Sequence, residues 1–494
     1  SAIPLLRHHH HQAMDARRRS PKKRKFERVP DQDSPPGSGS AGVDLINALP
    51  DAVLCTIVSL LPTKDGARTQ AIARRWRPLW RSAPLNLVAD STLSRQQRKR
   101  VVYVTKILAE HPGPALRLNL PYIRRRDYGK IDGWLRSQAL TDLQELHLGY
   151  DSQDSPPPSL LSPSALRFAP TLRVATFTDC HFPDLSAQSL NFSHLQQLGL
   201  YGVTFSALSA HYLNFPRLKQ LTMSVVTILE DALHNMLSGC LSLESLLLED
   251  NVGFARLRIS SLTLRSIGFS APYTQGPSLF HELVIEDAPC LERLLPLSPD
   301  YGPTIVRVIR APKLQVLGVL SKGISKLHIG TTVFQEMTAI SLTTTMRTVK
   351  VLVIESFGPN LDAVIGFLKC FPCLERLYVL SQPWMEMKNV QKYDPLDPIE
   401  CLESYLKRVV WKNYIGDMLD VEFAKFFVLN AKVLEEMKFV SSNSCDRQWK
   451  SNQHMCLQVD SRASPDARLE FISCMDVLGD DKRTHDLSMA DPFE

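Results

Sequence analysis

Long apolar runs are absent from this chain of 494 residues. A helix that crosses a bilayer needs about 20 consecutive apolar residues, whereas stretches such as Leu246–Leu248 and Val351–Ile354 are far shorter. The first residues also lack a secretory signal pattern, because a charged, proline-containing stretch lies where an apolar region would be needed. We therefore expect no membrane partner. The composition, 44% hydrophobic and 22% charged, is that of a soluble protein with a sizeable core.

Motifs for catalysis are missing as well. The sequence contains no G-x-x-x-x-G-K-[ST] phosphate loop, no H-E-x-x-H zinc motif and no G-x-S-x-G nucleophile elbow. Residues 37–42 do spell G-x-G-x-x-G, but they lie in a Gly/Ser-rich segment with no strand before it. Chance explains this match better than a dinucleotide site does. We predict a protein that is not an enzyme and has no cofactor.

Cysteines occur mostly singly, although the chain has ten of them. Without a secretory signal they indicate reduced thiols of an intracellular protein. The one close pair, Cys370 and Cys373, has the spacing of half a zinc site or of a redox motif. No second Cys or His pair lies at a fitting distance, so a loop between structural units is the better interpretation, and we predict no metal site.

The net charge of +6 is confined to one end of the chain. Residues 1–30 hold nine Lys and Arg against two acidic residues, a balance of +7, and the remaining residues hold 48 basic and 49 acidic groups, a balance of −1. The body of the protein therefore has no overall electrostatic bias toward nucleic acid. Nucleic-acid binding through residues 17–28 remains a rival hypothesis, with a steep dependence on salt as its signature.

A dense basic cluster explains this excess charge. Its members are Arg17, Arg18, Arg19, Lys22, Lys23, Arg24 and Lys25. Like charges and Pro21 keep such a stretch extended, and residues 31–43 form a Pro/Gly/Ser-rich linker after it. The Pro-Lys-Lys-Arg-Lys core resembles the nuclear import signals that importin-α binds. We expect a nuclear protein, with the cytoplasm as a second compartment; a merely solvated tail is the alternative.

Residues 44–88 predict three short helices that cannot bury their own apolar faces. Leu49, Val53, Ile57 and Leu60 recur at helical spacing as one stripe. Pro50 suits a first helical position, Pro62 stops the helix and Thr63 can cap the next one. Trp76, Leu79 and Trp80 then lie on one face of a third helix. So short a segment has too little interior for these groups, which predicts a partner surface.

This segment resembles the F-box of plant F-box proteins. The matching residues are Leu49-Pro50-Asp51, Ile57, Leu60-Leu61-Pro62-Thr63, Asp65, Ala67-Arg68-Thr69 and Arg74-Arg75-Trp76-Arg77 with Leu79-Trp80-Arg81. The resemblance implies binding to a Skp-type adaptor and, through it, to a cullin ubiquitin ligase. Gln70, Ala73 and Pro78 depart from the pattern, and Pro78 is expected to remove one hydrogen bond and kink the third helix. The alternative is an ordinary three-helix segment packed on the rest of the protein.

A phrase of the form L-x-x-L-x-L recurs through the middle of the chain. It starts at Leu143, Leu172, Leu195, Leu218, Leu243, Leu264, Leu314, Val349 and Leu374. Intervals of 21 to 29 residues through Leu264 have the period of leucine-rich repeats. The last two apolar positions alternate on a short strand, and stacked units bury them together. Phrases at 283–285, 291–295 and 324–329 match only in part.

A second resemblance covers residues 399–440. This stretch is similar to the FBD module that follows the repeats in many plant F-box proteins. Val409 and Trp411 share one face of an expected strand. An expected helix presents the stripe Phe423, Phe426, Phe427, Ala431 and Leu434. Because an open repeat array needs a terminal cap, we expect this module to cover the end of the stack.

We thus predict an α/β protein in which a three-helix F-box precedes an irregular leucine-rich-repeat solenoid, with parallel strands on its concave face and an FBD cap. The expected parts are a basic tail and linker (1–43), the F-box (44–88), a connecting region (89–140), the repeats (141–385), the FBD-like module (386–477) and a polar, frayed tail (478–494).

The predicted function is target recognition within an SCF-type ubiquitin ligase. The F-box would hold the adaptor, and the repeats would hold a protein substrate that the sequence does not identify. The predicted adaptor-binding residues are Leu49, Pro50, Val53, Leu54, Ile57, Leu60, Trp76 and Trp80. The alternative is a nuclear interaction scaffold that does not deliver its partner for degradation.

Overall fold

The structure is a computed structural model. The structure describes residues 45–46, 48–151, 159–184, 189–207, 209–272, 279–298, 301–356, 361–381, 397–441, 445–473 and 480–494. Residues 1–49 form one unit and residues 50–494 form a second, which contains the helices and strands described below. The basic cluster at 17–25 lies outside the described residues.

Three helices open this unit. They are α1 (Asp51–Leu60), α2 (Thr63–Arg68), which continues into the 3₁₀ turn η1 (Thr69–Ala71), and α3 (Trp76–Ser82). Pro50 precedes the first helical residue, and its carbonyl accepts from the backbone N–H groups of Val53 and Leu54 at 3.0 and 3.1 Å. Pro62 takes the same position before α2.

Thr63 does not cap α2, contrary to the expectation from sequence. It is the first residue of the helix, and its buried hydroxyl instead donates to the carbonyl of Asn86 at 3.0 Å and accepts from the N–H of Val88 at 3.1 Å. The hydroxyl therefore ties α2 to the first strand of the sheet.

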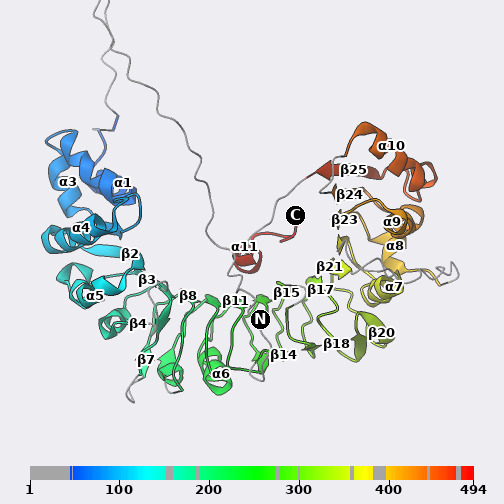
Figure 1. The fold of residues 1–494 in the computed structure, drawn as a ribbon, viewed down its shortest axis with the longest axis horizontal. Helices are drawn as coiled ribbons and strands as arrows, with labels where there is room; N and C mark the ends of the chain where they lie inside the picture. The colour runs from blue at the N-terminus through cyan, green and yellow to red at the C-terminus, as the bar shows by residue number, and fades with distance from the viewer. Residues whose placement is uncertain are drawn as a thin grey trace, which may run out of the picture. The chain divides into compact units, whose positions relative to one another are not determined.

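A ladder of 15 parallel strands dominates the described part of the chain (Figure 1). In spatial order the strands are β1 (Leu85–Val88), β2 (Ala115–Ile123), β3 (Glu145–Tyr150), β5 (Val174–Thr178), β8 (Gln197–Tyr201), β10 (Gln220–Ser224), β11 (Ser245–Glu249), β13 (Ser266–Phe269), β15 (Arg293–Pro296), β17 (Val316–Leu320), β21 (Val351–Ser356), β22 (Arg376–Ser381), β23 (Arg408–Lys412), β24 (Glu436–Ser441) and β25 (Arg468–Ser473). Each new strand adds to the edge left by the one before it, as stacked repeats require.

The repeated phrase explains the register of this ladder. Leu198 pairs with Leu221, which pairs with Leu246, so equivalent positions of successive units lie side by side. All three side chains are buried in the main core. The predicted strand in each repeat is confirmed, and the partial match at 291–295 forms β15 in the same ladder. That the strands line a concave face stays a prediction.

A second sheet of six strands was not anticipated. It contains β12 (Arg256–Ser260), β14 (Glu282–Asp287), β16 (Ile305–Val308), β18 (Lys326–Ile329), β19 (Thr332–Gln335) and β20 (Thr338–Ser341). Two short pairs, β4 (Ser159–Leu160) with β6 (Cys180–His181) and β7 (Leu190–Asn191) with β9 (Leu213–Asn214), complete the strands described.

The remaining helices lie between strands along the chain, except α11, which follows the last strand. They are α4 (Gln97–Glu110), α5 (Tyr128–Leu135), α6 (Glu230–Ser238), α7 (Leu361–Cys370), α8 (Glu400–Ser404), α9 (Met418–Asn430), α10 (Arg447–Cys456) and α11 (Asp480–His485), with 3₁₀ turns η2 (Arg125–Asp127), η3 (Gln138–Leu140), η4 (Pro163–Phe168), η5 (Ser209–Tyr212) and η6 (Val459–Ser461). Within the part of the chain that the structure describes, none of them combines the length and apolar character needed to cross a membrane.

The region expected to be a cap continues the ladder. β23, β24 and β25 pair in parallel with their predecessors instead of closing across the end of the stack. Val409 and Trp411 are both buried on one face, as predicted. The expected stripe on and after α9 is buried too, from Phe423 to Leu434.

The last described residues are not frayed, contrary to expectation. We call residues 480–494, which comprise α11 and the chain after it, the return segment. α11 packs against β11 and β13, far from β25 in the ladder (Figure 1). Thr484, Asp491 and Phe493 are all buried. The sequence did not predict this packing, because the contacts are made mainly by charged and hydroxyl groups, which give no hydrophobic pattern.

Candidate docking surface

Helix α1 has one buried and one exposed apolar face. Leu54 and Val58 are fully buried. On the other side Val53, Ile57 and Leu60, at positions i, i+4 and i+7, are 43%, 38% and 76% exposed. Single exposed apolar residues are common, but a row of them on one helix indicates a surface that a partner covers. We call Val53, Ile57 and Leu60 the α1 row.

The two tryptophans of the predicted set hold the helices together. Trp76 is 6% exposed, and neighbouring Leu79 is buried as well. Trp80 is half-buried, and its ring meets that of His111 edge-on with centroids 5.4 Å apart. Trp80 also covers Gly66 so closely that a Cβ there would lie 2.6 Å from the indole. These aromatic groups therefore have contacts within the chain and present little surface to a partner.

The predicted set thus divides into two groups. The α1 row and the exposed Pro50 face solvent, whereas Leu54 and Trp76 belong to the interior. Leu49 belongs to the first unit and is half-buried there. Spacing in the sequence indicated which residues share a helix. It did not indicate which of two apolar faces of α1 packs inward.

Two further features of this region were not singled out from the sequence. Ile72, just after η1, is 67% exposed and adds a large apolar side chain to the region. Asp51, at the start of α1, accepts from Arg75 at 2.6 and 2.9 Å, which joins α1 to the start of α3. The arginines at 74–77 were the one feature of the sequence that could have predicted this ion pair.

Pro78 does not interrupt α3. It is the third residue of a helix that runs from Trp76 to Ser82. The first N–H groups of a helix have no acceptor within it, so the missing N–H at this position costs no helical bond. The expected kink is therefore not present, and the Pro78 carbonyl accepts from the Ser82 hydroxyl at 3.0 Å.

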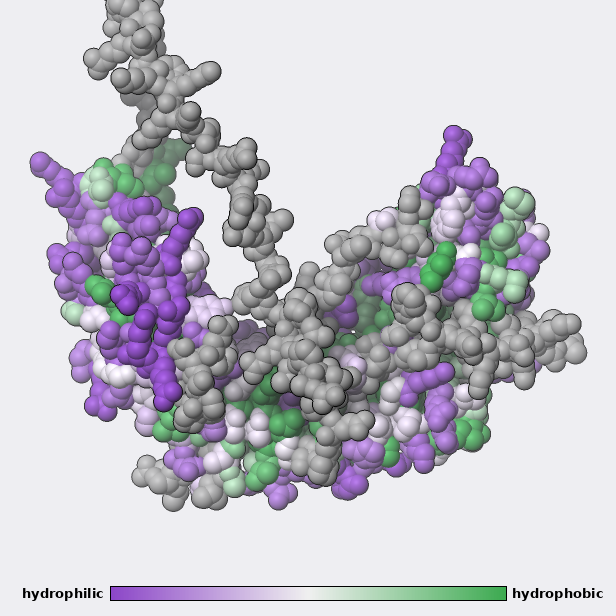
Figure 2. Space-filling model, in the orientation of Figure 1, coloured by the Kyte–Doolittle hydropathy of each residue, from purple (hydrophilic) through white to green (hydrophobic). Residues whose placement is uncertain are grey.

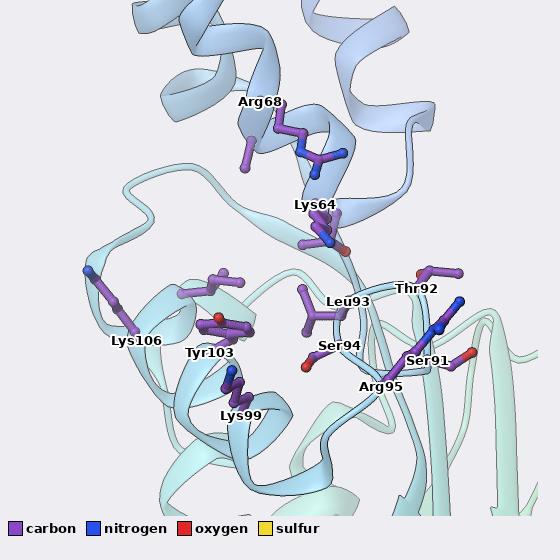
Figure 3. Close-up of a pocket in the computed structure, with 13 residues that line it drawn as sticks. Lys64, Arg68, Ser91, Thr92, Leu93, Ser94, Arg95, Lys99, Tyr103 and Lys106 are labelled. Carbon is purple, nitrogen blue, oxygen red and sulfur yellow. The ribbon is translucent and has the colours of Figure 1, made fainter. Parts of the chain in front are cut away.

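A basic recess of about 770 Å³ lies between α2, the loop at 91–95 and α4 (Figure 3). Lys64 and Arg68 enter it from α2, and Lys99, Tyr103 and Lys106 enter it from α4 (Figure 3). Hydrophilic residues gather over this end of the molecule (Figure 2). No acidic side chain is among the described residues that line the recess. Arg68 pairs with Asp65 at 3.0 Å and Lys106 lies 3.9 Å from Glu110, so the attraction for carboxylate or phosphate groups of a partner comes mainly from Lys64, Arg95 and Lys99.

Nothing in the described residues suggests chemistry on a bound metal. No group of three or more His, Cys, Asp or Glu side chains there could hold an ion. Burial raises the pKa of the Cys370 thiol to about 12, so this sulfur is held as a protonated thiol. Cys370 donates to the carbonyl of Thr344 at 3.6 Å, and its neighbour Cys373 is half-buried.

Comparison with known families identifies the architecture. The family model described as "FBD-associated F-box protein At5g56370, LRR repeats" matches residues 131–213 and 205–379, which is half of the chain. The chain belongs to the plant F-box/FBD/LRR-repeat family. The model of the FBD module matches residues 394–439, which confirms the second resemblance.

Curated relatives in this family match most of the chain. The F-box/FBD/LRR-repeat protein At3g26920 of Arabidopsis thaliana is 23% identical over 435 residues, covering 82% of this chain and 91% of the relative. The FBD-associated F-box protein At1g66310 of the same plant is 25% identical over 386 residues, covering 75% and 72%. Both names contain the F-box, and no enzyme family is indicated by these matches.

Proposed function

We propose that residues 44–88 are an F-box that binds a Skp-type adaptor, and that the chain is the target-binding subunit of an SCF-type cullin ubiquitin ligase. The observation that carries this proposal is the α1 row, which stays exposed while Leu54 and Val58 of the same helix are fully buried. The F-box names of the relatives support the same assignment.

The mechanism is proximity. The adaptor holds one end of the chain, the ladder holds a target, and the assembled ligase places target lysines beside a conjugating enzyme. Bringing the two reactants together replaces an encounter in solution by a nearly intramolecular reaction, with a large gain in rate. This chain contributes binding and orientation and forms no covalent bond to the target.

The decisive test removes the α1 row. In the triple variant Val53→Ser/Ile57→Ser/Leu60→Ser, three apolar contacts with the adaptor are lost, at about 1 kcal/mol each for side chains already partly exposed. We expect adaptor affinity to fall about a hundredfold, measured by titrating the purified full chain with purified adaptor.

The matched control is Leu241→Ser/Leu262→Ser, which replaces two residues of the repeat region that are 71% and 74% exposed. Its adaptor affinity should stay at the wild-type value. Equal adaptor affinity of the triple variant and this control would refute the F-box assignment. Adaptor binding without recruitment of cullin, or without ubiquitination of any bound protein, would favour the non-degradative scaffold instead.

A further inference from the structure

The return segment crosses the strands on the side of the ladder opposite the main core. We call this side the second face, formed by alternate residues such as Leu247, Leu295 and Tyr378, which build a smaller apolar cluster of their own. Along the segment, the His485 ring meets the Thr222 hydroxyl on β10 at 2.8 Å, and Phe493 joins the cluster near β22. The segment therefore spans strands from widely separated repeats.

The end of the segment is held by charge and an aromatic contact. The buried carboxylate of Asp491 accepts from Arg376 at 2.9 Å and from the Tyr378 hydroxyl at 2.7 Å. The Phe493 ring packs against Tyr378 with centroids 5.8 Å apart. Arg408, on the next strand, donates to Glu494 at 2.6 Å. Charge-assisted bonds to a buried carboxylate are strong and geometrically selective.

The basic and aromatic groups of this site come from the ladder itself. Arg376 and Arg408 are partners in register on β22 and β23, and Tyr378 pairs with Val410 two residues further along the same strands. Two guanidinium groups and a phenol thus lie at fixed spacing on rigid strands. Their spacing matches a carboxylate, an aromatic ring two residues later and a second carboxylate next to the ring, as in Asp491, Phe493 and Glu494.

The middle of the return segment fits the ladder less well. Arg293 on β15 is only 3% exposed, and it donates to backbone carbonyls, those of Asp486 at 2.9 Å, Arg483 at 3.3 Å and Met489. Burial lowers its pKa, and the nearby charges of Glu292, Asp486 and Asp491 oppose that shift only in part. A carboxylate bonded directly to this buried guanidinium would stabilise its charge further than carbonyls and more distant carboxylates do.

Two hydroxyl groups at the contact between the segment and the ladder, one on β13 and one on α11, reinforce this point. Ser266 and Thr484 are buried, and each has a side-chain oxygen without a hydrogen-bond partner in the described residues. A buried polar group that lacks a partner costs free energy. Another ligand with a carboxylate near Arg293 would satisfy this part of the face better than the chain's own residues do.

We propose that the second face at β15, β22 and β23 is a binding site for an acidic segment of a target protein with the pattern Asp-x-Phe-Glu, and that the return segment occupies this site as an internal competitor. Tethering gives the internal competitor a high effective concentration. The apparent affinity for a target equals the intrinsic affinity multiplied by the fraction of molecules in which the return segment has left the site. The inference relies on the proposed function only in treating the bound segment as part of a target.

The test uses a fluorescent peptide with the sequence of residues 486–494, Asp-Leu-Ser-Met-Ala-Asp-Pro-Phe-Glu, and the full chain. In the release variant, Asp491→Ala/Phe493→Ala removes the two anchors of the internal competitor and leaves the ladder unchanged. We expect the release variant to bind the peptide at least tenfold more tightly than wild type, measured by fluorescence anisotropy. Adding Arg376→Ala/Arg408→Ala should reverse that gain.

Three controls make the result specific. A peptide with both anchors replaced by alanine should not bind, and Met455→Ala/Asp466→Ala, which alters an exposed apolar and an exposed acidic residue elsewhere, should behave as wild type. Gly268→Ala is a second way to release the segment, because a Cβ there would lie 2.3 Å from the Thr484 hydroxyl oxygen, and Thr484 is absent from the peptide.

Failure of both release variants to bind the peptide more tightly than wild type would overturn the proposal, as would binding that survives loss of the two arginines. Adaptor binding is measured separately on the same proteins. Loss of peptide binding with intact adaptor binding would refute only this inference, and the reverse result would refute only the F-box assignment.

Discussion

Individual residues of the predicted docking set have two different physical roles. The α1 row is exposed, so the stability of the fold does not depend on its burial. Leu54 and Trp76, in contrast, are interior residues. Both kinds carry the motif, because a docking helix needs a supported side and a presented side. We expect a substitution at either kind to lower the proposed adaptor binding, but for different reasons.

Unfolding measurements distinguish these roles. Trp76→Ala removes a large buried side chain and should lower the free energy of unfolding of the helical region by about 3–5 kcal/mol. Leu60→Ala, at a side chain that is 76% exposed, should change it by at most about 0.5 kcal/mol. Urea denaturation followed by circular dichroism measures both. Similar losses in the two variants would contradict the assignment of Leu60 to a free surface.

Whole elements followed the sequence where burial is periodic. Each L-x-x-L-x-L phrase makes a strand because two leucines two residues apart point to the same side and need neighbours that do the same. The return segment has no such period. Its position depends on Arg293, Arg376 and Arg408, which lie in other parts of the sequence, so no local pattern reveals it.

The return segment should be sensitive to pH through His485. Burial lowers the pKa of this ring to about 4, compared with about 6.5 for a free histidine. The docked state therefore favours the neutral ring. The stabilisation is complete above about pH 6.5 and is lost as the pH falls toward 4.

Hydrogen exchange measures this release. After correction for intrinsic rates, amides of residues 483–494 should lose protection between pH 6.5 and 4.5. His485→Gln should remove that dependence. Glu494 is not the cause in this range, because its bond to Arg408 lowers its pKa below the usual value. Protection that stays constant in the wild type would contradict this role for His485.

At the scale of the molecule, one ladder joins the parts that the sequence divides into repeats and FBD module. β22 of the last recognised repeat pairs directly with β23, and α9 contributes a buried aromatic face alongside. A parallel strand edge can always accept another strand of matching register, so an added module extends the array instead of ending it.

The basic cluster at 17–25 acts at this scale too, and we propose that it directs nuclear import. Its charge is separate from the nearly neutral body of the chain. In a fluorescent fusion of the full chain, Lys22→Ala/Lys23→Ala/Arg24→Ala/Lys25→Ala should shift the protein from nucleus to cytoplasm. The control Arg98→Ala/Lys99→Ala, which removes exposed basic residues of α4, should not. Unchanged nuclear fluorescence in the first variant would contradict the proposal.

The sequence alone determined the repeat period, the strand in each repeat, the helices at 51–82 and the buried stripe of α9, because these depend on the spacing of apolar residues along a short stretch. Only the tertiary structure decided which face of α1 stays exposed, the extension of the ladder by β23–β25 and the path of the return segment. Those features depend on contacts between residues far apart in the chain. The free energy of such contacts arises only when packing brings the groups together and removes them from water.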